Sequence, residues 1–66
     1  MTTKAFLTKA VATEEYALLL QTDVFDLDLE DRLNDVLEVC GVELFTEEYD
    51  VLINDLQEQF LYDQAN

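Results

Sequence analysis

Carboxylates are the only abundant side chains in this chain that could take part in chemistry. The 66 residues include 16 Asp or Glu against three Lys or Arg, which gives a formal net charge of −13 at pH 7. No histidine and no serine occur, so the Ser–His and Cys–His pairs of nucleophilic catalysis are excluded, as is every histidine metal ligand. Carboxylates in such numbers carry no specific signal for acid–base catalysis. We therefore expect a protein that is not an enzyme and needs no cofactor.

The densest group of charges is the stretch DVFDLDLEDR, residues 23–32, which holds five carboxylates and one arginine. From Asp26 onward it resembles the beginning of an EF-hand calcium loop. The glycine that such a loop needs at its sixth position is Asp31 here, and the closing glutamate is Leu37. The pattern fails at both positions, so we expect no metal site.

Cys40 is the only cysteine, which rules out an internal disulfide and gives no sign of a secreted framework. Nearby carboxylates disfavour its thiolate, so we expect a small buried hydrophobe. The mildly basic N-terminal stretch contains AFLTKAVA, which is too short and too interrupted for a signal peptide or a membrane span. A cytoplasmic protein without membrane contact is the expectation.

Size and apolar content predict a single folded domain over residues 1–66. Half of the residues are apolar, including four Phe and three Tyr, which is too many for a disordered acidic tail. Area scaling indicates that a chain of this size buries about 60% of its unfolded surface. There is no proline, and Gly41 is the only glycine, so no linker is indicated.

The clearest predicted helix runs from Asp28 to Cys40. Asp28 is the expected N-cap, its carboxylate accepting from the unpaired amides of the first turn, and Gly41 suits the left-handed position that ends a helix. The apolar stripe consists of Leu29, Leu33, Val36, Leu37 and Cys40.

A second helix is predicted from Thr46, as N-cap, to Leu61 or Tyr62. Its apolar stripe consists of Tyr49, Leu52, Ile53, Leu56 and Phe60, and the aromatic members together with Tyr62 are expected in the core. The short GVELF connection before it is expected to place Val42 or Leu44 in the core.

The first third of the chain is less regular. Thr13 is the expected cap of a short helix through Leu20, and residues 3–12 are predicted to be helical as well, with a strand as the alternative because KAFLTKAV alternates loosely. DVFDLDL is expected to be an extended link. Its alternation would place Val24 or Phe25, together with Leu27 and Leu29, inward and the acids outward.

These elements predict an all-α fold, a small bundle of three helices with short connections, or of four if the first is broken after Ala12.

The acids fall into rows opposite the apolar stripes, and nothing in the sequence pairs them. Rows on a helix repeat every ~4.5–6 Å, and those of an extended link every ~6–7 Å. A basic partner surface could neutralise such an array. The candidate partner-binding residues are Asp26, Asp28, Glu30, Asp31, Asp35, Glu38, Glu47, Glu48, Asp50, Asp55 and Glu58.

Small size, high acidity and missing catalytic residues resemble the phage-encoded DNA-mimic inhibitors, including many anti-CRISPR proteins. The resemblance covers the whole chain by size and charge and includes no diagnostic motif. It implies a non-catalytic inhibitor in a bacterial host cell that occupies the DNA-binding surface of a CRISPR effector, a restriction enzyme or a repair enzyme. Direct contact with nucleic acid or an anionic membrane is not expected, because phosphates would repel the chain.

Two other interpretations remain open. The chain could be an acidic adaptor or antitoxin-type regulator, for which Phe25 and Phe45 would be the apolar anchors. It could instead be a salt-adapted small domain whose acids serve solubility alone. Val39, Val51 and Leu61 lie off the apolar stripes, which leaves a homodimer open under any of these interpretations.

Overall fold

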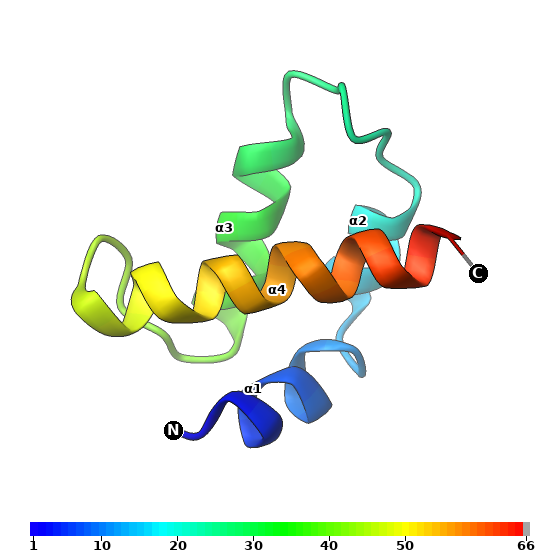
Figure 1. The fold of residues 1–66 in the computed structure, drawn as a ribbon. Coiled ribbons are helices and arrows are strands. Elements are labelled where there is room, and N and C mark those ends of the chain that lie inside the picture. The colour runs from blue at the N-terminus through cyan, green and yellow to red at the C-terminus, as the bar shows by residue number, and fades with distance from the viewer. Residues whose placement is uncertain (66) are drawn as a thin grey trace.

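The computed structural model describes residues 1–65, which form four helices around one apolar core (Figure 1). The helices are α1 (Thr3–Ala10), α2 (Glu14–Leu20), α3 (Leu29–Val39) and α4 (Glu47–Ala65). α4 packs against each of the other three, and α2 also packs against α3. The described residues contain no strand, so the all-α prediction is confirmed, in its four-helix alternative.

The break between α1 and α2 is made by Thr13. Its hydroxyl donates to the Ala10 carbonyl at 2.7 Å and accepts from the Tyr16 amide at 3.1 Å, so one side chain satisfies the end of one helix and the start of the next. The predicted cap is confirmed. The first helix is shorter than residues 3–12, because its last helical residue is Ala10.

Gly41 and Thr46 delimit the connection between α3 and α4 as predicted. Gly41 has φ +85°, in the left-handed region, and the Thr46 hydroxyl accepts from the Tyr49 amide at 3.2 Å. Val42 is buried between them and Leu44 packs against the core. α4 continues to Ala65, beyond the predicted end at Leu61 or Tyr62.

The expected extended link is wrong: residues 23–29 form two consecutive turns. The Asp26 amide donates to the Asp23 carbonyl at 2.9 Å, and the Leu29 amide donates to the Asp26 carbonyl at 3.2 Å. Each turn is closed again by the aspartate that begins it. The Asp23 carboxylate accepts from the Phe25 amide at 2.9 Å, and the Asp26 carboxylate accepts from the Asp28 amide at 2.8 Å.

The turns change which side chains face inward. Val24 and Leu29 pack against the core, whereas Phe25 is 90% exposed and Leu27 is 98% exposed. The prediction that Leu27 points inward is therefore wrong. Asp28 does precede α3, but its carboxylate makes no capping hydrogen bond, which corrects the second expectation for this stretch.

Every helix contributes to the core. Cys40 is buried, and so are Tyr49 and Phe60, as expected; Tyr62 is 66% exposed, so its assignment to the core is wrong. The largest fully buried side chains are Phe6, Phe60, Leu19, Leu33, Leu37, Leu52, Leu56 and Val36.

Candidate functional site

The outer face of α3 carries the most regular acidic row. Asp31, Asp35 and Glu38 are all exposed, on the side of the helix opposite its buried Leu33 and Val36. At 1.5 Å rise per residue their positions are separated by about 6 and 4.5 Å along the axis. A single stiff helix therefore presents three carboxylates to solvent at fixed intervals.

The first turn of α4 gathers a second group, Glu47, Glu48 and Asp50, all exposed. Carboxylates are favourable there because the amides at a helix N-terminus carry partial positive charge. The Met1 ammonium lies 3.9 Å from the Glu48 carboxylate, and this contact is the only ion pair among residues 1–65. It is solvent-exposed and contributes little.

Farther along α4 the predicted acidic row is interrupted. Glu58 is exposed as expected, but the exposed apolar residues Val51 and Leu61 lie on the same outward side of the helix. The outer face of α4 is therefore acidic near its N-terminus and mixed toward its C-terminus.

Asp55 is held within the fold rather than presented with the other candidates. It is half-buried, and its carboxylate accepts a hydrogen bond from the Thr3 hydroxyl at 2.9 Å. This contact ties α1 to α4 across 52 residues of sequence. The expectation that nothing inside the chain pairs the candidate acids is wrong at this position.

Tyr49 is affected by one acid of α3 and one acid of α4. Its hydroxyl donates to the Asn34 side chain at 2.6 Å. Burial raises the pKa of Tyr49, and the negative charges of Glu30 on α3 and Asp50 on α4 raise it further. One carboxylate of α3 and one of α4 thus act on the same phenol.

The acids of the connecting stretch do not form the evenly spaced array expected of an extended link. Asp26 and Asp28 are exposed, but the first closes a turn and the second follows it. The side chain at Asp26 therefore has a structural use of its own. Glu30, also exposed, belongs to the first turn of α3.

Within residues 1–65, none of the three basic side chains forms an ion pair with the acidic row of α3. Lys4 and Lys9 are on α1, and the Lys9 ammonium donates to the Cys40 carbonyl at the C-terminal end of α3, at 3.4 Å. Arg32 is half-buried on α3. Among the residues described, no cation forms an ion pair with the outward acids of α3, and in the first turn of α4 only Glu48 has one, the Met1 ammonium.

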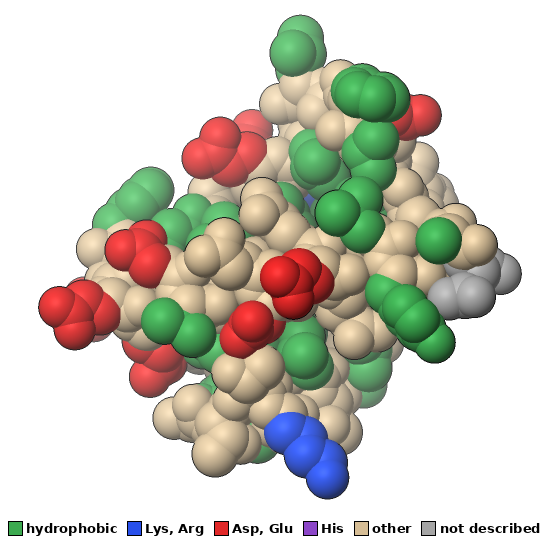
Figure 2. All heavy atoms as spheres, in the orientation of Figure 1, with side chains coloured by type: hydrophobic (Ala, Val, Ile, Leu, Met, Phe, Trp, Pro, Cys, Tyr) green, Lys and Arg blue, Asp and Glu red, His purple; other side chains and the backbone are tan. Residues whose placement is uncertain are grey.

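Sequence reasoning named Phe25 and Leu61 as exposed apolar candidates but did not place them on one apolar surface beside the acids. Figure 2 shows hydrophobic side chains gathered over the loop between α2 and α3 and down toward α4, with acidic side chains concentrated around the other half of α4. Phe25 and Leu27 project from that loop, and Leu61 lies on α4. The signal was in the sequence only as apolar residues that fit no helical stripe.

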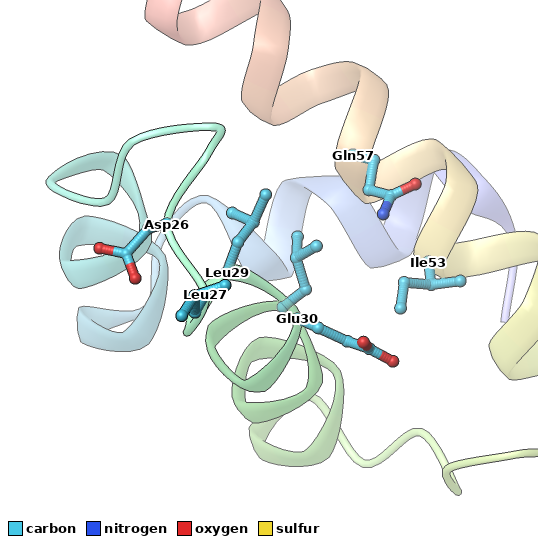
Figure 3. A pocket seen from close by; sticks show the side chains of 7 residues that line it. Asp26, Leu27, Leu29, Glu30, Ile53 and Gln57 are labelled. Carbon is cyan, nitrogen blue, oxygen red and sulfur yellow. The ribbon is translucent and has the colours of Figure 1, made fainter.

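Two adjoining pockets lie beneath this surface. The first, about 360 Å³, lies between the loop, α3 and α4, and Figure 3 shows Gln57 pointing from α4 toward α3 above it. The second is about 240 Å³. Both contain Leu29 and Gln57, so they form one groove, whose lining residues are Val24, Asp26, Leu27, Leu29, Glu30, Leu33, Ile53, Gln57, Phe60 and Leu61.

The described side chains offer no other obvious chemistry. No group of three or more Cys, Asp or Glu in residues 1–65 is arranged to hold a metal ion. Burial raises the pKa of the Cys40 thiol, with the Lys9 charge opposing and the Glu15 charge adding to the shift. That side chain is a thiol packed in the core.

No family model, curated protein or solved structure matches the chain. Within the described helices, none combines the length and hydropathy that crossing a membrane would require.

Proposed function

We propose that this protein is a non-catalytic inhibitor that binds a basic, nucleic-acid-binding surface of another protein by imitating the charge of DNA. The observation that carries the proposal is the exposed row of Asp31, Asp35 and Glu38 on one stiff helix, and the exposed acids in the first turn of α4 are a second group. No cation of the described chain pairs with that row.

Charge density supports this function. The chain carries a net charge of −13 and its longest dimension is 26 Å. That is one net charge for about every 2 Å of length, close to the one phosphate per ~1.7 Å of axis in duplex DNA. A surface that binds DNA would therefore meet a similar amount of negative charge per ångström of length on this protein.

The physical gain comes from neutralisation. Lysine and arginine side chains of the partner would form charge-assisted hydrogen bonds with the carboxylates, and counterions held by both surfaces would be released. Opposite fields would also accelerate encounter. Both contributions weaken with added salt, which gives the proposal a measurable signature.

The resemblance to phage-encoded inhibitors sets the expected targets. The partner would be a CRISPR effector, blocked where it receives target DNA, or a restriction or repair enzyme with a comparable groove. The inhibitor would then act in the cytoplasm of a bacterial host cell.

A second candidate is an acidic adaptor or antitoxin-type regulator that binds its partner through apolar anchors. The observation in its favour is the exposure of Phe25 and Leu27 on a loop held by four hydrogen bonds. Such a complex would persist at high salt and would be weakened by Phe25→Ala rather than by loss of charge.

Displacement of DNA separates the candidates. Labelled duplex is bound to a purified CRISPR effector, restriction enzyme or repair glycosylase, and fluorescence anisotropy follows its release as the protein is added. The variant Asp35→Asn/Glu38→Gln should displace at least about tenfold less well, equivalent to about 1.4 kcal/mol. The matched control Glu14→Gln/Glu43→Gln, which removes two exposed acids elsewhere, should behave like the unmodified protein. Equal loss in both variants would argue against a specific acidic row.

A further inference from the structure

We infer that the groove between the 22–28 loop, α3 and α4 binds an amphipathic helix of a partner protein, with that helix's apolar face in the groove and its lysines or arginines against the surrounding acids. The inference shares with the proposed function only the basic character of the partner. DNA imitation is not needed for it.

Two adjoining pockets make up the groove. Its two pockets, about 360 and 240 Å³, adjoin at Leu29 and Gln57. Leu33 and Ile53 line the first pocket, and Phe60 and Leu61 line the second. Apolar walls along an open groove are how amphipathic helices are recognised, through side chains repeating at i, i+3 or i+4, and i+7.

The loop that forms one wall is held in place. Besides the turns at Asp23 and Asp26, the Gln64 side-chain amide donates to the Thr22 carbonyl at 2.7 Å and fastens the beginning of the loop to α4. Phe25 and Leu27 are therefore kept outward by specific hydrogen bonds. A surface already shaped before binding loses less conformational entropy when the partner arrives.

The exposure of these two side chains favours a partner that covers them. Burial of a phenylalanine or leucine side chain stabilises a complex. Phe25 and Leu27 forgo this gain in the isolated chain, at 90% and 98% exposure. A helix lying in the groove would contact the loop as well as α4.

Charge decides which helix fits. Glu30 lines the first pocket and extends from α3 toward α4 near Ile53, whereas the Asp26 carboxylate points away from Gln57 and Ile53 (Figure 3). Glu30 makes no ion pair with a described residue. A helix with lysine or arginine flanking its apolar face would neutralise it.

The same charge argues against a second copy of this chain as the occupant. Two copies would bring together two bodies of net charge −13 each. Like charges opposed across an interface disfavour association. A basic helix would be attracted by the negative charge around the groove, whereas a second copy of this chain would be repelled by it.

The probe for this inference is a synthetic peptide of leucine and lysine, about 18 residues long, so that its helix spans roughly 27 Å. Its leucines lie on one helical face. A peptide of identical composition with the leucines scattered around the helix has the same charge but no apolar face. Isothermal titration calorimetry compares the two at about 0.15 M salt and again at about 1 M, where charges are screened beyond about 3 Å.

The amphipathic peptide should bind at least about tenfold more tightly than the scattered one, or about 1.4 kcal/mol. That preference should survive at high salt. In Leu27→Ser/Leu61→Ser the two peptides should bind about equally well, so the preference should be lost. The control Val51→Ser changes an exposed α4 position outside the groove and should leave the preference unchanged. Both groove leucines are exposed, so the fold is expected to persist, and circular dichroism checks this. Leu27→Ser alone replaces the double variant if that variant unfolds.

Equal affinity for the two peptides would overturn the inference, as would an equal effect of Val51→Ser. Analytical ultracentrifugation supplies a further outcome: a dimer that Leu27→Ser/Leu61→Ser dissociates would assign the groove to self-association. None of these results depends on DNA displacement. The groove and the DNA-imitating surface can therefore fail separately.

Discussion

The hydroxyl of Tyr16 donates a hydrogen bond to the carboxylate of Asp63 and so joins α2 to the last turns of α4. The Gln59 side chain donates to the same carboxylate at 3.1 Å. Among the many acids of the chain, Asp63 thus has a defined internal role. The contact also explains why α4 continues past its expected end, because its last turns are held against α2.

Removal of the Tyr16 hydroxyl should destabilise the fold. Hydrogen bonds to charged groups contribute about 1.5–3 kcal/mol. Tyr16→Phe is therefore expected to lower the free energy of unfolding by about 1.5 kcal/mol or more, measured by urea denaturation. Gln59→Ala, which removes only the second donor to Asp63, should cost less. An unchanged midpoint for Tyr16→Phe would show that the contact adds nothing.

Alkaline pH should weaken the fold through the same tyrosine. Burial raises the pKa of Tyr16, and the hydrogen bond to Asp63 and its charge raise it further. A group whose pKa is higher when folded than when unfolded contributes stability below the unfolded pKa, about 10 for tyrosine. The contribution of Tyr16 to the thermal midpoint should therefore be constant below pH ~10 and be lost progressively above it. Tyr16→Phe should show a shallower fall, and equal falls would contradict this assignment.

Core and groove leucines should differ sharply in their effect on stability. Leu56 is fully buried, so Leu56→Ala is expected to cost about 2–5 kcal/mol. Leu27 is almost wholly exposed, and Leu27→Ala should change the free energy of unfolding by no more than about 0.5 kcal/mol. A large loss for Leu27→Ala would mean that this side chain is packed rather than available to a partner.

Phe45 should contribute little to stability despite being aromatic. It has φ 65°, a left-handed conformation that costs a residue with a Cβ about 1–2 kcal/mol. Its ring lies 5.3 Å from that of Tyr49, a contact that contributes about 0.5–1.5 kcal/mol. Because asparagine tolerates this conformation, Phe45→Asn should alter the free energy of unfolding by less than about 1 kcal/mol. The buried Phe60→Ala, at about 3–5 kcal/mol, is the contrasting control.

The acidic row should be unfavourable to the fold itself. Asp31 and Asp35 are four residues apart and Asp35 and Glu38 three, spacings at which like charges repel, and Glu38 is close to the negative end of α3. Asp35→Asn/Glu38→Gln should therefore raise the free energy of unfolding by about 0.5–1 kcal/mol at low salt, with a smaller gain at high salt. A loss of stability would indicate a structural role for these acids.

The regular helices could be predicted from the sequence, and the connecting loop could not. Apolar spacing and the caps at Thr13 and Thr46 suffice for α2, α3 and α4, because these signals are local. In residues 23–29 the alternation of apolar and acidic residues suggested an extended strand. Side-chain hydrogen bonds from Asp23 and Asp26 favour turns instead, and alternation alone does not report them.

In the candidate site, too, some features could be predicted from the sequence and others could not. Exposure of Asp31, Asp35 and Glu38 follows from the helix period. The internal use of Asp55 does not, because its partner Thr3 is distant in sequence. The groove could not be predicted from the sequence either, because it depends on how the loop lies against α3 and α4.

The most direct test of DNA imitation is the salt dependence of binding to a partner from which this protein displaces DNA. Affinity is measured between about 0.05 and 0.2 M salt, where counterion release acts strongly. The plot of log affinity against log salt should be linear and steep, because its slope counts the counterions released on binding. For Asp35→Asn/Glu38→Gln the slope should correspond to about two fewer released ions. For Glu14→Gln/Glu43→Gln the slope should be unchanged. A flat plot for the unmodified protein, or the same change of slope in both variants, would contradict the proposal.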